Sequence, residues 1–337
     1  MSVPQKVLLG HGSGGRLSRE LVEKVFLKSF SNPALRLLED SAEVRAGGVR
    51  LAFTTDSYVV TPVEFPGADI GRVAVCGTVN DLAVKGARPA ALSAAFILEE
   101  GFSLALLTRL TASMRRAAAE AGVPIVTGDT KVVEKGHADG VFINTAGIGV
   151  IPPGRALASA SVRPGDVIIV SGNLADHGVA VMNARNKLGL SGGVKSDAAP
   201  LNGLIEAALS VSKGIRAMRD ITRGGLATVL NEVSGACGLS AELDEDCVPV
   251  SAAARGACAL LGLDPLYVAN EGKIALFASP AEAEKIVKAL RRHKYGRNAA
   301  IAGRMLAEKR PQVRLNTGIG GSRILLMLEG EQLPRIC

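Results

Sequence analysis

The feature that most limits the possible folds is a break near the middle of the chain, the run Pro152-Pro153-Gly154. Proline cannot continue a helix or a central strand, and an adjacent glycine favours a turn. The run divides the 337 residues into two stretches of similar length, and a chain this long exceeds one small core. We therefore predict two domains, residues 1–151 and 152–328, followed by a mobile tail at 329–337.

Both stretches mix helical and strand patterns without the regular alternation of a doubly wound sheet, so the expected class is α+β. Ser103 can cap the longest helix of the first stretch, and Gly122 can end it. Apolar spacing there predicts helices at 17–30, 70–85 and 103–121 and strands at 49–55, 58–63, 90–98, 124–127 and 140–151. The second stretch predicts a strand after a turn at 163–166, helices at 175–187, 201–213, 224–236, 250–261 and 281–292, and strands at 266–277 and 322–328.

Composition narrows the class of partner. The net charge of +7 comes from 39 basic residues scattered among 32 acidic ones, and aromatic residues make up only 3%. No basic run is interleaved with stacking aromatics, so we expect no nucleic-acid partner, and the mild positive charge suits anionic phosphates. The sequence has no signal-peptide pattern and no 18-residue apolar run, which predicts a cytoplasmic protein without membrane contact. The five cysteines form no CxxC pair, which argues against zinc.

Three acidic motifs in the first stretch are candidates for a metal site. Asp56 lies in Thr-Thr-Asp-Ser, Asp81 follows Asn80 in a predicted helix, and Asp129 precedes Thr130 and Lys131. Asp40 is a possible fourth. Carboxylates together with Asn and Thr oxygens are the ligands that Mg²⁺ takes when it also binds phosphates. Taken singly, each Asp could instead form a turn or cap a helix. Asn and Asp are unfavourable inside a helix, so the Asn80-Asp81 pair indicates a role beyond local stability.

Two glycine-rich elements could bind phosphate. The first, GHGSGG at 10–15, contains His11, Gly14 and Gly15. The second, at 220–226, places Arg223, Gly224 and Gly225 at the start of a predicted helix. Backbone N–H groups at a helix N-terminus attract anions, and glycines allow the anion to approach closely. Neither element has the P-loop pattern, and either could be an ordinary turn.

The last residue of the sequence is Cys337, in the run Pro-Arg-Ile-Cys. A thiol in this position could enter a pocket, react there and leave again. Pro334 would stiffen the base of this arm, and Arg335 would place a cation near the sulfur and favour the thiolate. The alternative is a frayed end without function.

Taken together, these motifs resemble the HypE family of hydrogenase maturation factors, the carbamoyl dehydratases of the PurM-like ATP-binding superfamily. The similarity extends over essentially the whole chain, and the final Pro-Arg-Ile-Cys is the part specific to HypE. The matching stretches are HGSGG (11–15), TTDSYVVTP (54–62), FPGADIGRVAVCGTVNDLAVKGARP (65–89), TGDTKVV (127–133), DITRGGLA (220–227), NEGK (270–273) and PRIC (334–337).

The resemblance implies a PurM-like two-domain fold whose N-terminal β-sheet domains pair in a homodimer, with a C-terminal α/β sandwich domain. It implies that Cys337 receives a carbamoyl group from the carbamoyltransferase HypF. ATP-driven dehydration would then give an S-cyanide, and the cyanide would pass to iron on a HypC–HypD scaffold.

The resemblance also implies the roles of the site residues. Glu271 would accept protons, and Lys131 would relay them or stabilise the departing phosphate; how the two divide this work is open. The expected Mg²⁺ ligands are Asp40, Asp56, Asp81 and Asp129. The expected ATP or phosphate contacts are His11, Gly14, Gly15, Asn80, Thr130, Arg223, Gly224 and Gly225.

Two alternatives stay open. One is another ATP-using enzyme of the superfamily. Selenophosphate synthetase would require a cysteine near residues 10–16, where there is none, and a small-molecule kinase would leave Cys337 unused. The other is a non-catalytic maturation scaffold. ATP hydrolysis that requires a carbamoylated tail separates both alternatives from the dehydratase.

Overall fold

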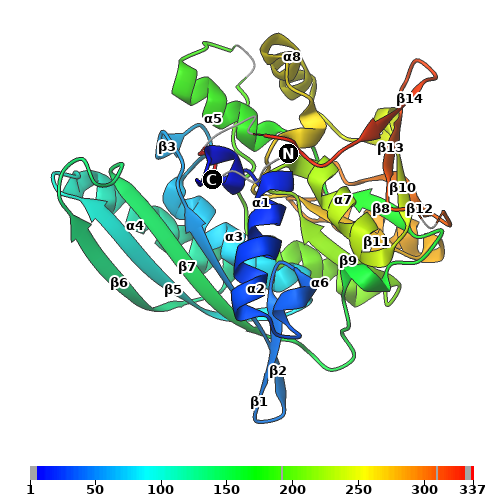
Figure 1. The fold of residues 1–337 in the computed structure, drawn as a ribbon, viewed down its shortest axis with the longest axis horizontal. Coiled ribbons are helices and arrows are strands. Elements are labelled where there is room, and N and C mark those ends of the chain that lie inside the picture. Colours follow the sequence, from blue (N-terminus) through cyan, green and yellow to red (C-terminus); the bar gives the residue numbers. More distant parts are fainter. Residues whose placement is uncertain (1–5, 191–192, 309, 331–334) are drawn as a thin grey trace.

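The structure, a computed structural model, describes residues 6–190, 193–308, 310–330 and 335–337. It contains a five-stranded sheet built from residues 42–150 and a seven-stranded sheet built from residues 167–325 (Figure 1). The expected α+β class is confirmed. Among the described residues, no helix has the length and apolar character needed to cross a bilayer.

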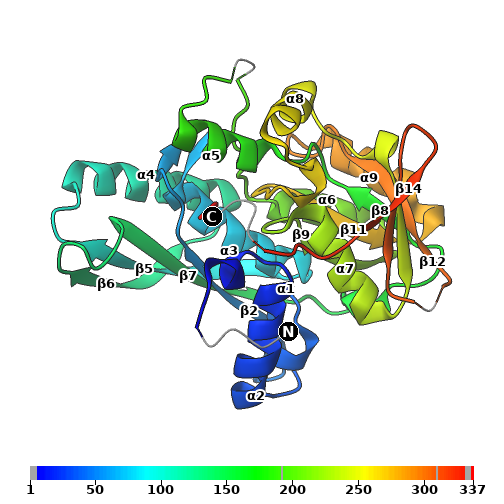
Figure 2. The same ribbon diagram turned by 45° about the horizontal axis from the view of Figure 1, so that its top comes forward.

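The five-stranded sheet has the strand order β1-β2-β7-β5-β6, with β6 at one edge. Only β5 and β6 are parallel neighbours; the other pairs are antiparallel. Helices α3 and α4 cover one face (Figure 2). The elements are β1 (Ala42–Ala46), β2 (Val49–Tyr58), β5 (Arg88–Glu99), β6 (Ile125–Val133), β7 (Val141–Val150), α3 (Ile70–Val84) and α4 (Leu104–Ala121), with the small pair β3 (Glu64–Phe65) and β4 (Ala68–Asp69).

Helix α3 is buried over its whole length, because it packs on the first sheet and also contacts the second half of the chain. A helix that is apolar all round is a core helix. Its buried polar residues bind both neighbours: Asp81 accepts from Thr54 of the first sheet, and Asn80 binds backbone groups of the second half.

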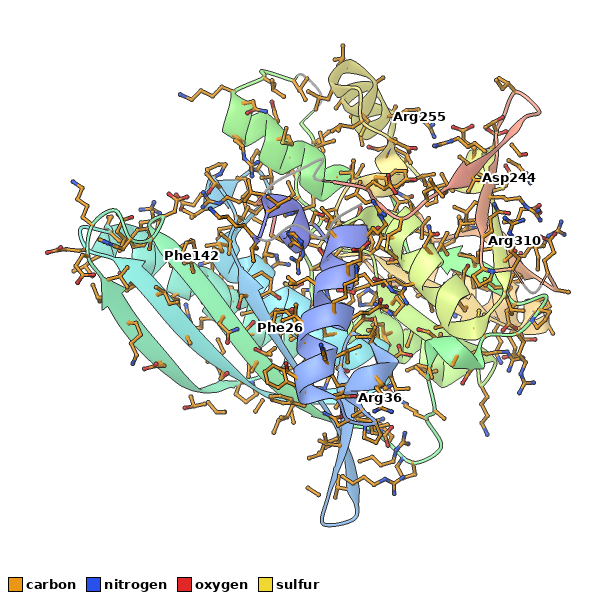
Figure 3. All side chains as sticks on the ribbon, in the orientation of Figure 1. Phe26, Arg36, Phe142, Asp244, Arg255 and Arg310 are labelled. Carbon is orange, nitrogen blue, oxygen red and sulfur yellow. The ribbon has the colours of Figure 1, made fainter. Side chains whose placement is uncertain are left out.

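The other face of the five-stranded sheet is open. It carries exposed apolar side chains of β2, β5 and β7, including Phe53, Ile97 and Ile148. A helical segment made of α1 (Arg16–Leu21), a π-helical turn (Val22–Phe26) and α2 (Leu27–Phe30) lies near the junction of the halves. Phe26, labelled in Figure 3, is also largely exposed on this segment.

The seven-stranded sheet has the order β14-β13-β10-β12-β8-β11-β9, with helices packed against it. Two apolar clusters fill the space between this sheet and its helices. Its strands are β8 (Val167–Val170), β9 (Ile215–Asp220), β10 (Ser240–Asp244), β11 (Ile274–Ala278), β12 (Ala300–Leu306), β13 (Val313–Asn316) and β14 (Ser322–Leu325). Its helices are α5 (Asp176–Asn186), α6 (Asn202–Val211), α7 (Gly225–Cys237), α8 (Ala252–Leu261) and α9 (Ala283–Arg292).

Two expected strands are wrong. The stretch 266–277 is a strand only from Ile274, because Pro265 starts a short 3₁₀ turn and the following residues form a loop. The expected strand at 58–63 does not form as a separate element, because β2 continues to Tyr58 and the sheet ends there. Pro334 and the rest of 331–334, in the predicted tail, lie outside the described residues.

Candidate active site

The end of the chain is docked between the two halves of the protein. Residues 335–337 run antiparallel to 59–61, with the Val59 N–H donating to the carbonyl of Cys337 at 3.0 Å and the Thr61 N–H to Arg335 at 3.3 Å. Ile336 is 3% exposed and packs in the core beneath the first sheet. The resting position of the tail, which the sequence left open, is therefore inside the protein.

Helix α5 holds the tail from the opposite side. His177 in its first turn lies 2.8 Å through Nε2 from the carbonyl oxygen of Ile336. Arg185 in its last turn donates to the carbonyl oxygens of Arg335 at 2.6 Å and Thr61 at 2.8 Å. The tail thus touches a strand extension from the first half and a helix from the second.

The docked sulfur meets Glu271 and Arg223. Burial raises the pKa of Cys337 to about 12 although Arg223 opposes the rise, and the neighbouring Glu271 carboxyl adds to it. The predicted cation was Arg335, but that side chain forms an ion pair with Asp139 instead. The docked thiol is therefore protonated at neutral pH, and the favourable cation comes from the second glycine-rich element.

Glu271 is 3% exposed, and its Oε1 has no hydrogen-bond partner among the residues that the structure describes. Burial raises the pKa of Glu271 well above its ordinary range, and the charges of Asp220 and Asp197 add to the rise. A buried carboxyl with a raised pKa binds a proton more strongly than an exposed one.

A group of buried carboxyls lies beside this pair. The pKa of Asp81 is raised well above its usual range by burial, with Asp56, Asp220 and Asp40 adding repulsion. Burial raises the pKa of Asp40 in the same way and that of Asp220 to about 7, although Arg219 opposes both rises. Thr54 donates to Asp81 at 2.7 Å, and the phenol of Tyr58 donates to Asp56 at 3.2 Å.

The chemistry of these carboxyls suits a Mg²⁺ ion that also binds phosphate. Asp40 pairs with Arg219 through Oδ1 at 2.7 Å, but its buried Oδ2 has no hydrogen-bond partner in the described part of the chain. Within the described ranges, no three Asp, Glu, His or Cys side chains are arranged to bind an ion by themselves. Mg²⁺ at nucleotide sites usually takes one or two carboxylates and completes its shell with phosphate and water. These carboxyls repel one another, and a cation bound among them would relieve that repulsion.

The two glycine-rich elements lie against each other. The Arg223 guanidinium donates to the carbonyl of Gly12 at 2.7 Å, and a Cβ on Gly14 would lie 2.8 Å from the Cβ of Arg223. Gly224 precedes α7 with a φ of 78°. Gly15 packs so closely that a Cβ would lie 2.2 Å from the carbonyl oxygen of Leu328. His11 binds the backbone of Leu8 within the same loop.

A cavity of about 260 Å³ opens between these elements and the tail. Its lining includes Gly12, Ser57, Arg223, Gly224 and Cys337. The cavity therefore joins both predicted phosphate elements to the sulfur.

Other predicted site residues are not part of this cluster. Asn80 uses its side chain to join α3 to the second half, accepting from Leu201 N at 2.7 Å and donating to Ala199 O at 3.1 Å. The phosphate role predicted for Asn80 stays a prediction, and in this structure its amide binds backbone groups of the second half.

Asp129, Thr130 and Lys131 lie on edge strand β6, away from the sulfur of the same chain, and their site roles stay predictions. Register places Asp129 level with Ser57, but β5 and β7 stand between their strands. Three strand spacings separate the two by roughly 14 Å. Asp129 and Lys131 pair with each other at 3.0 Å on the open face of the sheet.

Sequence reasoning missed three residues of the site. Asp220 was visible as the acidic residue that opens the motif of Arg223, and Tyr58 lies on the same face of β2 as Asp56 because strand side chains alternate. His177 had no signal, since a single histidine in an apolar helix usually belongs to the core.

Comparisons with known proteins show which family the chain is similar to. The family described as AIR synthase related protein, N-terminal domain, matches residues 38–151, and its C-terminal counterpart matches 163–316. The carbamoyl dehydratase HypE of Rhodobacter capsulatus is 54% identical, covering 99% of this chain and 98% of that protein. The HypE of Escherichia coli (strain K12) is 46% identical, covering 98% and 99%.

Solved structures are similar over the same length. A hydrogenase maturation protein HypE in complex with ATP is 47% identical with a TM-score of 0.83, covering 98% of this chain and all of that one. A chain from a HypE–HypF complex is 45% identical with a TM-score of 0.87, covering 91% and 99%. A thiamine monophosphate kinase from Aquifex aeolicus, 16% identical at a TM-score of 0.64, shares the fold.

Proposed function

Because this chain belongs to the HypE family and has its PurM-like fold, we propose that it is an ATP-dependent carbamoyl dehydratase acting on the sulfur of its own Cys337. The product is an S-cyanide (a thiocyanate), which supplies the CN ligands of the NiFe-hydrogenase iron. The observation that carries the proposal is the docked tail, whose sulfur meets the buried Glu271 and the cation Arg223 at a cavity lined by both glycine-rich elements.

The reaction removes one oxygen and two protons from the carbamoyl group. The carbamoyl oxygen attacks the γ-phosphorus of ATP, and phosphorylation makes that oxygen a good leaving group. The C–O bond then breaks as the nitrogen gives up its two protons, leaving a C≡N group on sulfur together with ADP and phosphate. Arg223 and the N-terminus of α7, where Gly224 has no side chain, stabilise the charge that collects on phosphate.

Glu271 is the proposed proton acceptor. It already contacts the sulfur, so a carbamoyl group on that sulfur lies within its reach. Burial raises its pKa well above the ordinary range, so this carboxylate binds a proton more strongly than an exposed one does.

Asp40, Asp56, Asp81 and Asp220 would hold Mg²⁺ together with ATP phosphates. The ion supplies charge neutralisation to the triphosphate. Before the ion binds, the buried carboxyls repel one another. This repulsion is the second cause of the raised pKa of Asp81, and burial is the first.

A second copy of the chain would complete the site. Asp129 and Lys131 lie on the open sheet face together with exposed apolar side chains such as Phe53 and Ile148. Pairing of this face with the same face of another subunit would bury the apolar residues and bring Lys131 toward the partner's phosphate site. This homodimer gives Lys131 its proposed place beside the departing phosphate.

Partners follow from the same chemistry. The docked thiol has its pKa raised to about 12 and is a poor nucleophile, so we propose that HypF loads the carbamoyl group while the tail is outside the cavity. We further propose that a HypC–HypD iron scaffold takes the cyanide, and that both steps occur in the cytoplasm.

The test is intact-mass analysis of the chain after incubation with a carbamoyl donor system and ATP. The native protein should gain one carbamoyl group and then lose the mass of one water. Deleting Cys337, or substituting Cys337→Ser, should abolish both changes while ATP binding persists. A protein without Cys337 that still delivers cyanide would contradict the proposal and leave the kinase or scaffold alternatives.

A further inference from the structure

The tail is held next to its cysteine by a histidine without an assigned role. His177 is fully buried in the first turn of α5, and its Nε2 lies 2.8 Å from the carbonyl oxygen of Ile336. Its Nδ1 lies 2.8 Å from the hydroxyl of Ser196, and its ring packs edge-on against Phe65 with 5.5 Å between ring centres. Both ring nitrogens are therefore engaged, and the ring orientation is fixed from three sides.

These contacts determine where the proton resides. A carbonyl oxygen can only accept, so Nε2 of His177 must carry the proton and donate to Ile336. Nδ1 is then the acceptor, and the hydroxyl of Ser196 donates to it. Ser196 is itself held, because its N–H donates to Pro66 O at 2.8 Å and its Oγ accepts from Ala198 N at 3.2 Å.

Burial keeps the ring neutral. It lowers the pKa of His177 below 6.5, although Asp197 nearby acts in the opposite direction. The uncharged ring with one donor and one acceptor is thus the form present at neutral pH, and it matches the two partners.

The hydrogen bond from His177 to Ile336 limits where the sulfur of Cys337 can lie. The Ile336 carbonyl belongs to the peptide group that leads into Cys337, and a peptide group is planar. Fixing that carbonyl fixes the Cα of Cys337 and so the starting point of its side chain. Arg185 holds the preceding carbonyl, one residue farther from the sulfur.

We propose that His177 is a positioning residue, whose Nε2–H fixes the Ile336 peptide group so that the sulfur of Cys337, and any group bound to it, lies against Glu271. The inference that His177 fixes the docked tail is argued from the contacts alone. The effect of His177 on dehydration rests on the proposed function.

The test compares two substitutions of similar size. In His177→Gln, the side-chain amide reaches nearly as far as Nε2 and keeps a donor for Ile336; in His177→Leu, no donor is present. Cys337 is alkylated with iodoacetamide in the full-length protein without ATP, and its rate is read from the C-terminal peptide. Cys247, which is exposed, is followed in the same samples as the matched control.

Loss of one buried hydrogen bond changes a docking equilibrium by roughly fivefold or more. We therefore expect Cys337 to react at least about fivefold faster in His177→Leu than in the native protein, and within about twofold of it in His177→Gln. Cys247 should react equally in all three proteins. Ser196→Ala removes only the hydroxyl that orients the ring, so its Cys337 alkylation rate should lie between those of the native protein and His177→Leu. This variant replaces His177→Leu in the comparison if His177→Leu does not fold.

The second measurement is the rate at which a carbamoylated tail loses water in a single turnover with ATP. The rate should fall in His177→Leu and recover in His177→Gln, while ATP affinity stays unchanged in both. Equal alkylation rates in the native protein and the Leu and Ala variants, or equal behaviour of Gln and Leu, would overturn the inference. Where the alkylation order holds but the native tail never loses water, the proposed function fails and the docking role stands.

Discussion

Replacing Asp220 by asparagine should stabilise the protein above neutral pH while removing its ATP turnover. Burial raises the pKa of Asp220 to about 7 from an ordinary 3.8, even though Arg219 beside it opposes the rise. A carboxyl that is harder to ionise in the folded state gives stability that is fully present below about pH 4 and is lost as the pH rises through about 7. Asparagine carries no charge at any pH, so the variant does not lose this stability.

The size of the effect follows from the two pKa values. They differ by about three units, and each unit corresponds to about 1.4 kcal/mol, so ionised Asp220 costs at most about 4 kcal/mol above pH 7. For a protein of this size, we expect the melting temperature of Asp220→Asn to exceed that of the native protein by up to about 5 °C near pH 8. Near pH 4 the two proteins should melt together.

The assay is a pair of thermal unfolding curves at each pH without nucleotide, followed by ATP turnover with Mg²⁺ and a carbamoylated tail. Asp129→Asn is the control for unfolding, because Asp129 is exposed and its pKa is lowered by Lys131, so no alkaline gain is expected. Equal melting of native and Asp220→Asn protein at both pH values would refute the buried-charge reasoning. Undiminished ATP turnover would remove Asp220 from the metal site.

Two further predictions concern Glu271 and Gly224. In Glu271→Gln, ATP should still bind but conversion of the carbamoylated tail should slow by roughly 10²–10⁴-fold, since the proton acceptor is lost; a normal single-turnover rate by intact mass would place the acceptor elsewhere. In Gly224→Ala, the φ of 78° and a Cβ 2.2 Å from the Thr228 hydroxyl should cost about 1–2 kcal/mol or more and weaken ATP binding by calorimetry. Gly256→Ala, with no atom within 4 Å of the new Cβ, is the control, and equal behaviour of the two variants would reduce Gly224 to an ordinary helix start.

Short-range sequence signals were sufficient to predict where helices such as α4 begin and end. Ser103 does cap α4, accepting from Leu106 N at 3.3 Å, and Gly122 ends it with a φ of 69°. Such capping depends on neighbours within one turn, so the sequence contains the information. The apolar run at 58–63 predicts a strand for a physical reason as well. Its N–H groups at Val59 and Thr61 do bind an extended partner, but that partner is the distant tail, which no local pattern reveals.

The site was predictable where motifs share one face and not where the fold separates them. Asp56 and Asp81 converge because alternate residues of β2 face α3, where Thr54 already contacts Asp81. Asp129 belongs to the same superfamily signature, yet register puts it across the sheet from Asp56, and only the assembled structure shows this. His177 depends on one contact with Ile336, which lies 159 residues away in sequence.

The contact between the two ends of the chain has a consequence for biosynthesis. Ser13 donates to the carbonyl of Gly330, a partner 317 residues away, and Arg16 N–H donates to Leu328. The five-stranded sheet ends at Val150 and can form while the rest is translated, at about 5–20 residues per second. The first glycine loop must wait on the order of 10–40 s longer for its supporting partner. A nascent chain on the ribosome therefore lacks the backbone contacts that support the first glycine-rich loop until the segment with Leu328 and Gly330 has been made.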